Sequence, residues 1–358
     1  MERSNFPHRN LGEDDEELLN GIWAGLEMPD DRPDADGRDF DDVKRRIRRR
    51  VRRRWMSRAA LAGSAAAIVA AVVLVVRQPG VLPEPDAFAQ LQQMGVTVER
   101  PQVVMTADDG MRLVLENAAR LERRSEGEVA LRTETGEQRP LATERKLKVE
   151  VPNGRQFRLV LDDGSEVWLN AGSTLNYRSD FNRSSRDIGL SGEAYFEVTH
   201  NPRRPFVVEF EGGEIQVLGT SFNVKAYRDD DIVAVTLDEG RVVLDDRRGG
   251  RFELSPSEQL LYDRRSGEGR IVRGADAMRY SIWKDDVISF RDTPLAEVLE
   301  TLSRWYDVRF ETDGQPDRPI SYTFATDNTL LDSVLREMEL ISPVRFERTK
   351  TEIKVSFR

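Results

Sequence analysis

The sequence predicts a mainly β domain, either a sandwich or a solenoid, followed by a small α/β domain and preceded by one transmembrane helix. Three observations lead to this prediction. An uncharged stretch follows a dense basic block, short alternating runs fill the middle of the chain, and a strand–helix–strand pattern occurs twice near its end. The predicted units are residues 1–56, 57–77, 78–95, 96–275 and 283–358.

The composition excludes several classes of site. The chain has 358 residues, a formal net charge of −10 and no cysteine, so it offers no disulfide, thiolate nucleophile or thiolate metal site. Its two histidines, His8 and His200, lie far apart in the sequence. We therefore expect no metal, no cofactor and no enzyme activity on other molecules.

The first 43 residues are acidic and contain one short amphipathic stripe. The apolar residues of the stripe recur at helical spacing: Leu18, Leu19, Ile22, Trp23 and Leu26. A single short helix cannot bury such a stripe by itself. The segment is either a helix that docks in a groove of a partner or a loosely ordered acidic tail.

The basic block, Lys44 to Arg58, holds ten basic residues and no acid, and the uncharged stretch Ala59 to Val76 follows it directly. As a helix these 18 residues rise about 27 Å, close to the thickness of the hydrocarbon core of a bilayer. A cleaved signal peptide is disfavoured, because more than fifty residues precede the stretch. The positive-inside rule places the N-terminus in the cytosol and the rest of the chain outside it. The block also suits contact with anionic lipid.

The residues after the span fall into two regions of different composition and pattern. Residues 78–95 are rich in proline and read as an extended spacer. Residues 96–275 alternate short β-rich runs with turn pairs that indicate hairpins or tight corners, such as Asp109-Gly110, Asp163-Gly164 and Glu239-Gly240. The short β-rich runs and turn pairs of this second region predict the β domain.

Two β-α-β units are predicted in residues 283–358, with "EIKVSF" as a last strand. The first helix is expected to begin at an N-cap, Thr293, with Pro294 in the first helical position. Its apolar stripe is Leu295, Val298, Leu299, Leu302, Trp305 and Tyr306, and that of the second helix is Leu331, Val334, Leu335 and Met338. Each unit has too little core alone, so the two should pack as one domain.

Four ordered motifs carry a resemblance: "VPNGRQFRLVLDDGSEVWLNAGSTLNYRSDF", "LSGEAYFEVTHNPRRPFVVE", "VLGTSFNVKAY" and "VTLDEGRVVL". They resemble the periplasmic core of FecR-family anti-sigma factors of the Bacteroidota type. The trailing "ISFRDTPLAEVLETLSRWYDVRFE" is similar to the C-terminal domain of that type, which resembles the secretin and TonB short N-terminal domain. One departure is "SPSEQLLYD", where the family usually has a glycine before Glu258.

The resemblance implies transmembrane signalling from the inner membrane. The signalling domain of an outer-membrane TonB-dependent transporter would contact the exported region, and the cytosolic tail would hold an extracytoplasmic-function sigma factor. The tail would act as a pure inhibitor or as an inhibitor with an activating role. In some members the signal travels by stepwise proteolysis.

Two motifs have a chemical and a structural interpretation. Some FecR-like proteins cleave themselves at a bond matching Gly219-Thr220, although a plain turn at the start of a strand is favoured here and no base is evident nearby. Glu193 and Glu197 in "GEAYFEV" lie about 13 Å apart by strand rise, too far for a glycosidase pair. That motif is expected to be a half-buried strand, with Ala194, Phe196 and Val198 on one face and Tyr195 on the other.

Two other functions compete with signalling. One is a membrane-tethered structural protein that binds an envelope component through its β domain. The other is a nucleic-acid binder that uses the basic block, but the block has Trp55 as its one aromatic residue and lies within a turn of lipid. No direct contact with nucleic acid is therefore expected.

Overall fold

The computed structural model describes residues 101–357 apart from 124–128, 135, 142–144, 180, 183–184, 328–329 and 350–351. The acidic tail, the basic block, the predicted span and the spacer lie outside the described residues, as does the stripe at Leu18–Leu26. Within the described ranges, no helix is both long and apolar enough to cross a membrane.

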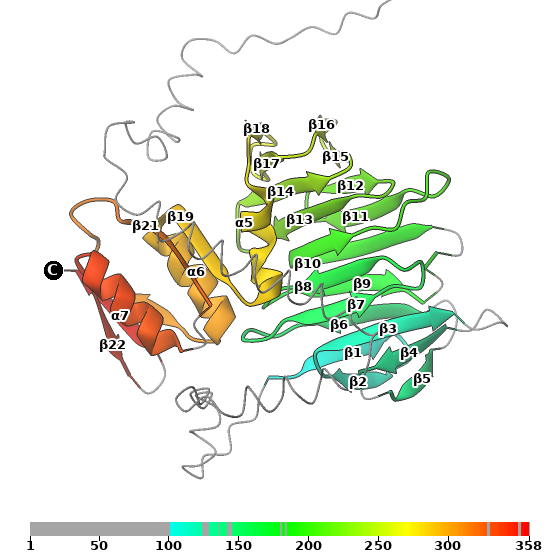
Figure 1. Ribbon diagram of the computed structural model, residues 1–358, viewed down its shortest axis with the longest axis horizontal. Coiled ribbons are helices and arrows are strands. Elements are labelled where there is room, and N and C mark those ends of the chain that lie inside the picture. The colour runs from blue at the N-terminus through cyan, green and yellow to red at the C-terminus, as the bar shows by residue number, and fades with distance from the viewer. Residues whose placement is uncertain are drawn as a thin grey trace, which may run out of the picture.

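The mainly β character is confirmed: 18 strands of the described region form one curled sheet with two halves (Figure 1). The first half runs in the order β2 (Arg112–Leu115), β1 (Val103–Ala107), β6 (Lys146–Glu150), β9 (Thr174–Arg178), β10 (Arg186–Glu197), β11 (Phe206–Phe210), β12 (Gly213–Val217), β15 (Val242–Asp246) and β16 (Arg251–Leu254). The second half runs in the order β5 (Gln138–Leu141), β4 (Val129–Thr133), β3 (Ala118–Arg123), β7 (Phe157–Val160), β8 (Glu166–Leu169), β10 again, β13 (Ser221–Ala226), β14 (Ile232–Glu239), β17 (Glu258–Asp263) and β18 (Gly269–Arg273).

Strand β10 belongs to both halves because it turns at Gly192. Its first part pairs with β9 and β11, and its second part pairs with β8 and β13. Gly192 has φ +114°, and a Cβ there would lie 2.6 Å from the Cα of Ser173. Only glycine fits this close approach of two backbones.

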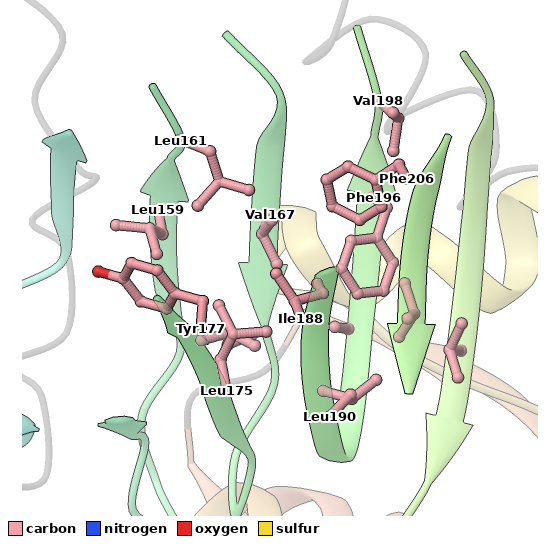
Figure 2. Packing of buried hydrophobic residues seen from close by; sticks show 14 of the residues in the cluster. Leu159, Leu161, Val167, Leu175, Tyr177, Ile188, Leu190, Phe196, Val198 and Phe206 are labelled. Atoms are coloured by element: carbon pink, nitrogen blue, oxygen red, sulfur yellow. The ribbon is translucent and has the colours of Figure 1, made fainter. Parts of the chain in front are cut away.

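One hydrophobic core fills the space between the halves, because the strands alternate buried and exposed residues as the sequence predicts. Figure 2 shows inward side chains from β7 to β11, among them Phe196 and Phe206. The ring of Phe196, in the second half, meets the ring of Phe206, in the first half, edge to face with their centroids 6.1 Å apart. The core therefore joins residues from both halves into one β domain.

The predicted turn pairs have two different roles. Gly110 and Gly164 lie in the hairpins β1–β2 and β7–β8, with φ +90° and +84°. Gly240, with φ +99°, lies instead at a corner between β14 of one half and β15 of the other. Ser257 has φ +66°, so it adopts the left-handed conformation that glycine favours before Glu258.

The C-terminal domain contains β19 (Ile288–Pro294), α6 (Leu295–Tyr306), β20 (Phe310–Thr312), β21 (Ser321–Thr326), α7 (Leu331–Ile341), β22 (Val344–Arg348) and β23 (Ile353–Phe357). The strands are not arranged as two parallel β-α-β pairs. Instead β19 pairs antiparallel with β21, while β20 and β22 flank β23. Helices α6 and α7 share one core with both small sheets.

The predicted start of the first helix is wrong by one residue. Helix α6 begins at Leu295, and Pro294 is its N-cap without a side-chain cap bond. Thr293 pairs with Tyr322 in the β19–β21 ladder, and its hydroxyl bonds to Arg291 instead of to the helix. Strand pairing therefore extends to the last residue before the helix.

A short helical linker connects the two domains, and the sequence patterns do not predict it. It consists of α5 (Ala277–Ser281) and η1 (Ile282–Asp285). Helix α5 packs on β13 and β14, on the face of the second half that points away from the core (Figure 1). The linker therefore covers part of the β domain before the C-terminal domain begins.

Candidate functional site

Gly219 and Thr220 lie at a crowded corner of the β domain. A Cβ at Gly219 would lie 2.5 Å from the Cα of His200 and 2.7 Å from its Nδ1, so the position requires glycine. Thr220 is buried, and its hydroxyl donates to the carbonyl of Arg241 at 3.0 Å. The corner is thus tightly packed, and its hydroxyl is already engaged.

The structure brings His200 beside Gly219, which the sequence did not reveal. The two residues are 19 positions apart, and no spacing rule relates them. The segment that carries His200 is held by Arg186, which is 1% exposed and donates to the carbonyls of Thr199 and Arg204, both at 2.8 Å. The Arg186 guanidinium also pairs with Asp163 at 3.1 Å.

A cleft of about 700 Å³ lies between the β domain and the C-terminal domain. Strand β19 and helix α6 line one side, and the outward residues of β13, β14 and β17 line the other. The cleft is rich in charge, with acidic residues in excess: Glu193, Asp229, Asp230, Asp231, Asp292, Glu297 and Glu300 face Lys225, Arg279, Arg291 and Arg304.

Glu193 lies at the floor of the cleft as a half-buried carboxylate. It accepts hydrogen bonds from the side-chain amides of Asn170 and Asn223, both at 2.9 Å. The Oδ1 atom of Asn223 in turn accepts the indole N–H of Trp283 at 3.1 Å. Burial raises the pKa of Glu193 despite these bonds and the nearby Lys225.

Glu193 and Glu197 have different surroundings, and the strand between them is more buried than predicted. Glu197 is exposed and pairs with Lys284 at 3.4 Å. Tyr195 is 3% exposed rather than lying on an open face, because the ammonium of Lys284 lies 3.8 Å from the centre of its ring. The linker therefore covers Tyr195 on the second face of β10, while Glu197 on the same face stays exposed.

Arg304 of α6 reaches across the cleft. Its guanidinium pairs with Asp230 at 2.8 Å and lies 3.8 Å from the centre of the Tyr227 ring. Burial lowers the pKa of Arg304, but Asp230 and its neighbours outweigh that effect and the net shift is upward. Lys225 of β13 pairs with Glu297 of α6 at 3.2 Å.

The C-terminal domain also presents free strand edges. Among the described strands, β20 and β22 each pair with β23 alone, and β19 and β21 pair with each other alone. Leu340 and Ile341, at the end of α7, are 80% and 63% exposed. Such edges and apolar side chains are what a strand added by a partner would use.

The described residues contain no group of three or more His, Asp or Glu side chains that is placed to hold a metal ion. The candidate sites are the Gly219 corner, the cleft and the free strand edges.

Comparison with known proteins gives matches to both domains. The family model described as FecR protein matches residues 147–243, and the model described as FecR, C-terminal, matches residues 287–355. No curated protein matches the chain significantly.

Two solved structures resemble the chain, both described as "a putative anti-sigma factor" from Parabacteroides distasonis ATCC 8503. The 2.50 Å structure has 29% identity and a TM-score of 0.56, and the match covers 60% of this chain and 99% of that one. The 1.65 Å structure has 29% identity and a TM-score of 0.55, with 59% and 99% covered.

Proposed function

The chain belongs to the FecR family of anti-sigma factors, and we propose that it relays a signal from an outer-membrane TonB-dependent transporter to an extracytoplasmic-function sigma factor. The observation that carries this proposal is the order of the two family matches. A FecR region that lies within the β domain is followed by a FecR C-terminal region that covers most of the C-terminal domain.

The inner membrane is the proposed location, with one span at residues 57–77. The ten basic residues before the span favour a cytosolic N-terminus and a periplasmic C-terminus. Anionic lipid headgroups would contact the same block. This topology places the sigma-factor contact and the transporter contact on opposite sides of the membrane.

The cytosolic contact is proposed for the stripe of Leu18, Leu19, Ile22, Trp23 and Leu26. An amphipathic helix gains stability when its apolar face is buried in a groove of a partner. The sigma factor would supply that groove, so the connection of this chain with DNA is indirect.

The periplasmic contact is proposed for the C-terminal domain. Each of β19, β20, β21 and β22 pairs with one other described strand, so each has a second edge along which an added strand could pair. The signalling domain of the transporter would supply the strand, and Leu340 and Ile341 lie at the end of the adjacent helix α7.

Co-purification of a tagged fragment, residues 1–56, with the cognate sigma factor tests the cytosolic half of the proposal. We expect the fragment to retain the sigma factor and the double variant Ile22→Ala/Trp23→Ala to lose it. Asn20→Ala, on the opposite face of the predicted helix, is the matched control and should bind normally. A fragment that binds no sigma factor and alters no sigma-dependent transcription would favour the alternative, a membrane-tethered structural protein that binds an envelope component.

Self-cleavage at Gly219-Thr220 is a second candidate, and the nearness of His200 is the observation in its favour. In that reaction the Thr220 hydroxyl attacks the Gly219 carbonyl carbon, the Gly219–Thr220 C–N bond breaks, and water hydrolyses the resulting ester to release two chains.

We expect the corner to be structural instead, because the hydroxyl of Thr220 is bonded to the Arg241 carbonyl. An immunoblot of membranes from Thr220→Ala cells should therefore show the same fragments as the wild type. Loss of a fragment in Thr220→Ala that is retained in Thr220→Ser would establish cleavage.

A further inference from the structure

The two exported domains have separate hydrophobic cores and meet through polar groups. The core of the β domain and the core of the C-terminal domain share no residue. Among the described residues, one small apolar cluster lies at their junction, formed by Ile282 and Val287 with Ala325 against it. Polar interfaces of this kind favour relative domain motion over a fixed arrangement.

The linker remains attached to the β domain through several contacts. Trp283 is 6% exposed; its indole N–H donates to Asn223 and its carbonyl accepts from the Gln156 amide at 3.1 Å. Lys284 adds its contact with the Tyr195 ring. A swing of the C-terminal domain would therefore begin after η1, where Asp286 is exposed and adopts φ +62°.

Beyond the linker, four contacts among the described residues hold helix α6 to the β domain. Arg304 pairs with Asp230 and covers Tyr227, and Lys225 pairs with Glu297. The backbone N–H of Gly154 donates to the carbonyl of Arg304 at 2.8 Å, which satisfies one of the unpaired carbonyls at the end of the helix. We call these contacts the α6 latch.

We propose that the α6 latch is releasable, and that its release carries the signal from the C-terminal domain to the β domain. The physical reason is that the separated charges regain their hydration when the latch opens, which offsets much of the lost attraction. When an apolar junction of the same size opens, its buried surface is exposed to water, and no hydration of charged groups offsets that cost. This inference rests on the proposed transporter contact, which would pull on the C-terminal domain.

The chain has no cysteine, so introduced cysteines report on single positions. Spin labels on Arg247→Cys and Leu340→Cys, both exposed, place one probe in each domain of the full chain in lipid nanodiscs. The distance distribution between the labels should be narrow, and Asp230→Asn should raise the ratio of undocked to docked molecules at least tenfold. Arg304→Gln, which removes the other partner, should do the same.

The control for these variants is Asp332→Asn. Asp332 also pairs with an arginine at 2.8 Å, but its partner, Arg348, lies in the same domain. We expect this variant to leave the distance distribution unchanged. A distribution that stays narrow in both Asp230→Asn and Arg304→Gln would overturn the latch, whatever the sigma-factor experiment shows.

A disulfide across the latch tests the signalling step. A Cβ at Gly154 would lie 3.5 Å from the Cβ of Asp307, within the range of a disulfide. Both positions have positive φ, so their strain is present in the reduced and the oxidised forms of Gly154→Cys/Asp307→Cys alike. The control pair Asn176→Cys/Gly189→Cys has a corresponding separation of 3.6 Å and lies wholly within the β domain.

We expect the oxidised latch pair to abolish induction of the sigma-dependent reporter and a periplasm-permeant reductant to restore it. The control pair should respond normally in both states. Suppose that the spin-label distances show the latch opening, but induction is normal with the latch pair oxidised. That result would overturn the signalling step and leave the proposed sigma-factor contact intact.

Discussion

The buried guanidinium of Arg186 determines the geometry around Gly219. Its five N–H donors serve the carboxylate of Asp163 and several backbone carbonyls of residues 199–218. A lysine in its place would offer a point charge rather than the planar fork that serves these acceptors together. One side chain thus positions the loop that carries His200.

Replacing Arg186 with methionine should destabilise the β domain by about 3–5 kcal/mol, because Asp163 remains buried without its cation. Urea unfolding of residues 96–358 followed by circular dichroism measures the change. Arg203→Met, at an exposed position of the same loop, should change stability by less than about 0.5 kcal/mol. A loss below about 1 kcal/mol for Arg186→Met would contradict the assigned role.

Glu193 should make stability depend on pH. Its folded pKa is raised above the unfolded value of about 4.5, so its protonated form contributes stability at low pH that is lost as pH rises through the folded pKa. Lys225 and Arg304 face it and limit the size of this loss.

Glu193→Gln lacks this titration. The difference in unfolding free energy, wild type minus variant, should therefore decrease as pH is raised from about 4.5. Urea unfolding of both proteins across pH 4–8 measures it. A difference that is constant or grows with pH would show that burial does not raise the pKa of Glu193.

At the scale of elements, the turn of β10 at Gly192 connects the two halves of the sheet. The same strand pairs with different neighbours on either side of the turn, with β9 and β11 before it and with β8 and β13 after it. The alternating pattern of "GEAYFEV" predicts a strand here, but the pattern does not contain the change of partners. That change requires the backbone of Ser173 to lie against Gly192.

Gly192→Ala should destabilise the β domain by about 2–4 kcal/mol, from the left-handed φ and the contact with Ser173 combined. Gly249→Ala is the matched control, because Gly249 also has positive φ but nothing lies within 4 Å of its added Cβ. It should cost about 1 kcal/mol. Thermal unfolding of both variants separates the effect of the contact with Ser173 from that of the backbone strain. Equal losses of stability in the two variants would show that small shifts relieve the contact.

At the scale of the whole molecule, charge and hydropathy along the chain predict its orientation in the membrane. The region that we propose to be exported is built from two domains with separate cores, and the proposed cytosolic contact lies before the predicted span. The orientation can be tested apart from signalling.

Replacing the six arginines at positions 48, 49, 50, 52, 53 and 54 with serine should reduce the fraction of molecules with an exported C-terminus, because the positive-inside signal is lost. Labelling of Leu340→Cys in intact spheroplasts with a membrane-impermeant maleimide measures that fraction. Neutralising six acids within residues 13–36 should have little effect, since acidic residues contribute little to orientation. Unchanged labelling in the arginine variant would contradict the proposed topology.

Much of the fold follows from local pattern. The alternation of the strands, the glycine turns at Gly110 and Gly164, and the buried stripes of α6 and α7 each depend on residues within a few positions of one another. The predicted start of α6 is wrong because Thr293 pairs in the β19–β21 ladder with Tyr322, which is 29 positions away. The linker α5–η1 has too few residues to show a periodic pattern.

The sequence by itself determined the mainly β character, the family and the apolar faces of the two C-terminal helices, because periodicity and motifs are properties of adjacent residues. The tertiary structure alone decided that β10 joins both halves, that His200 lies against Gly219, and that Arg304 reaches Asp230 and Tyr227. Those contacts join residues that are distant along the chain, and only the packing of complete strands and helices brings them together.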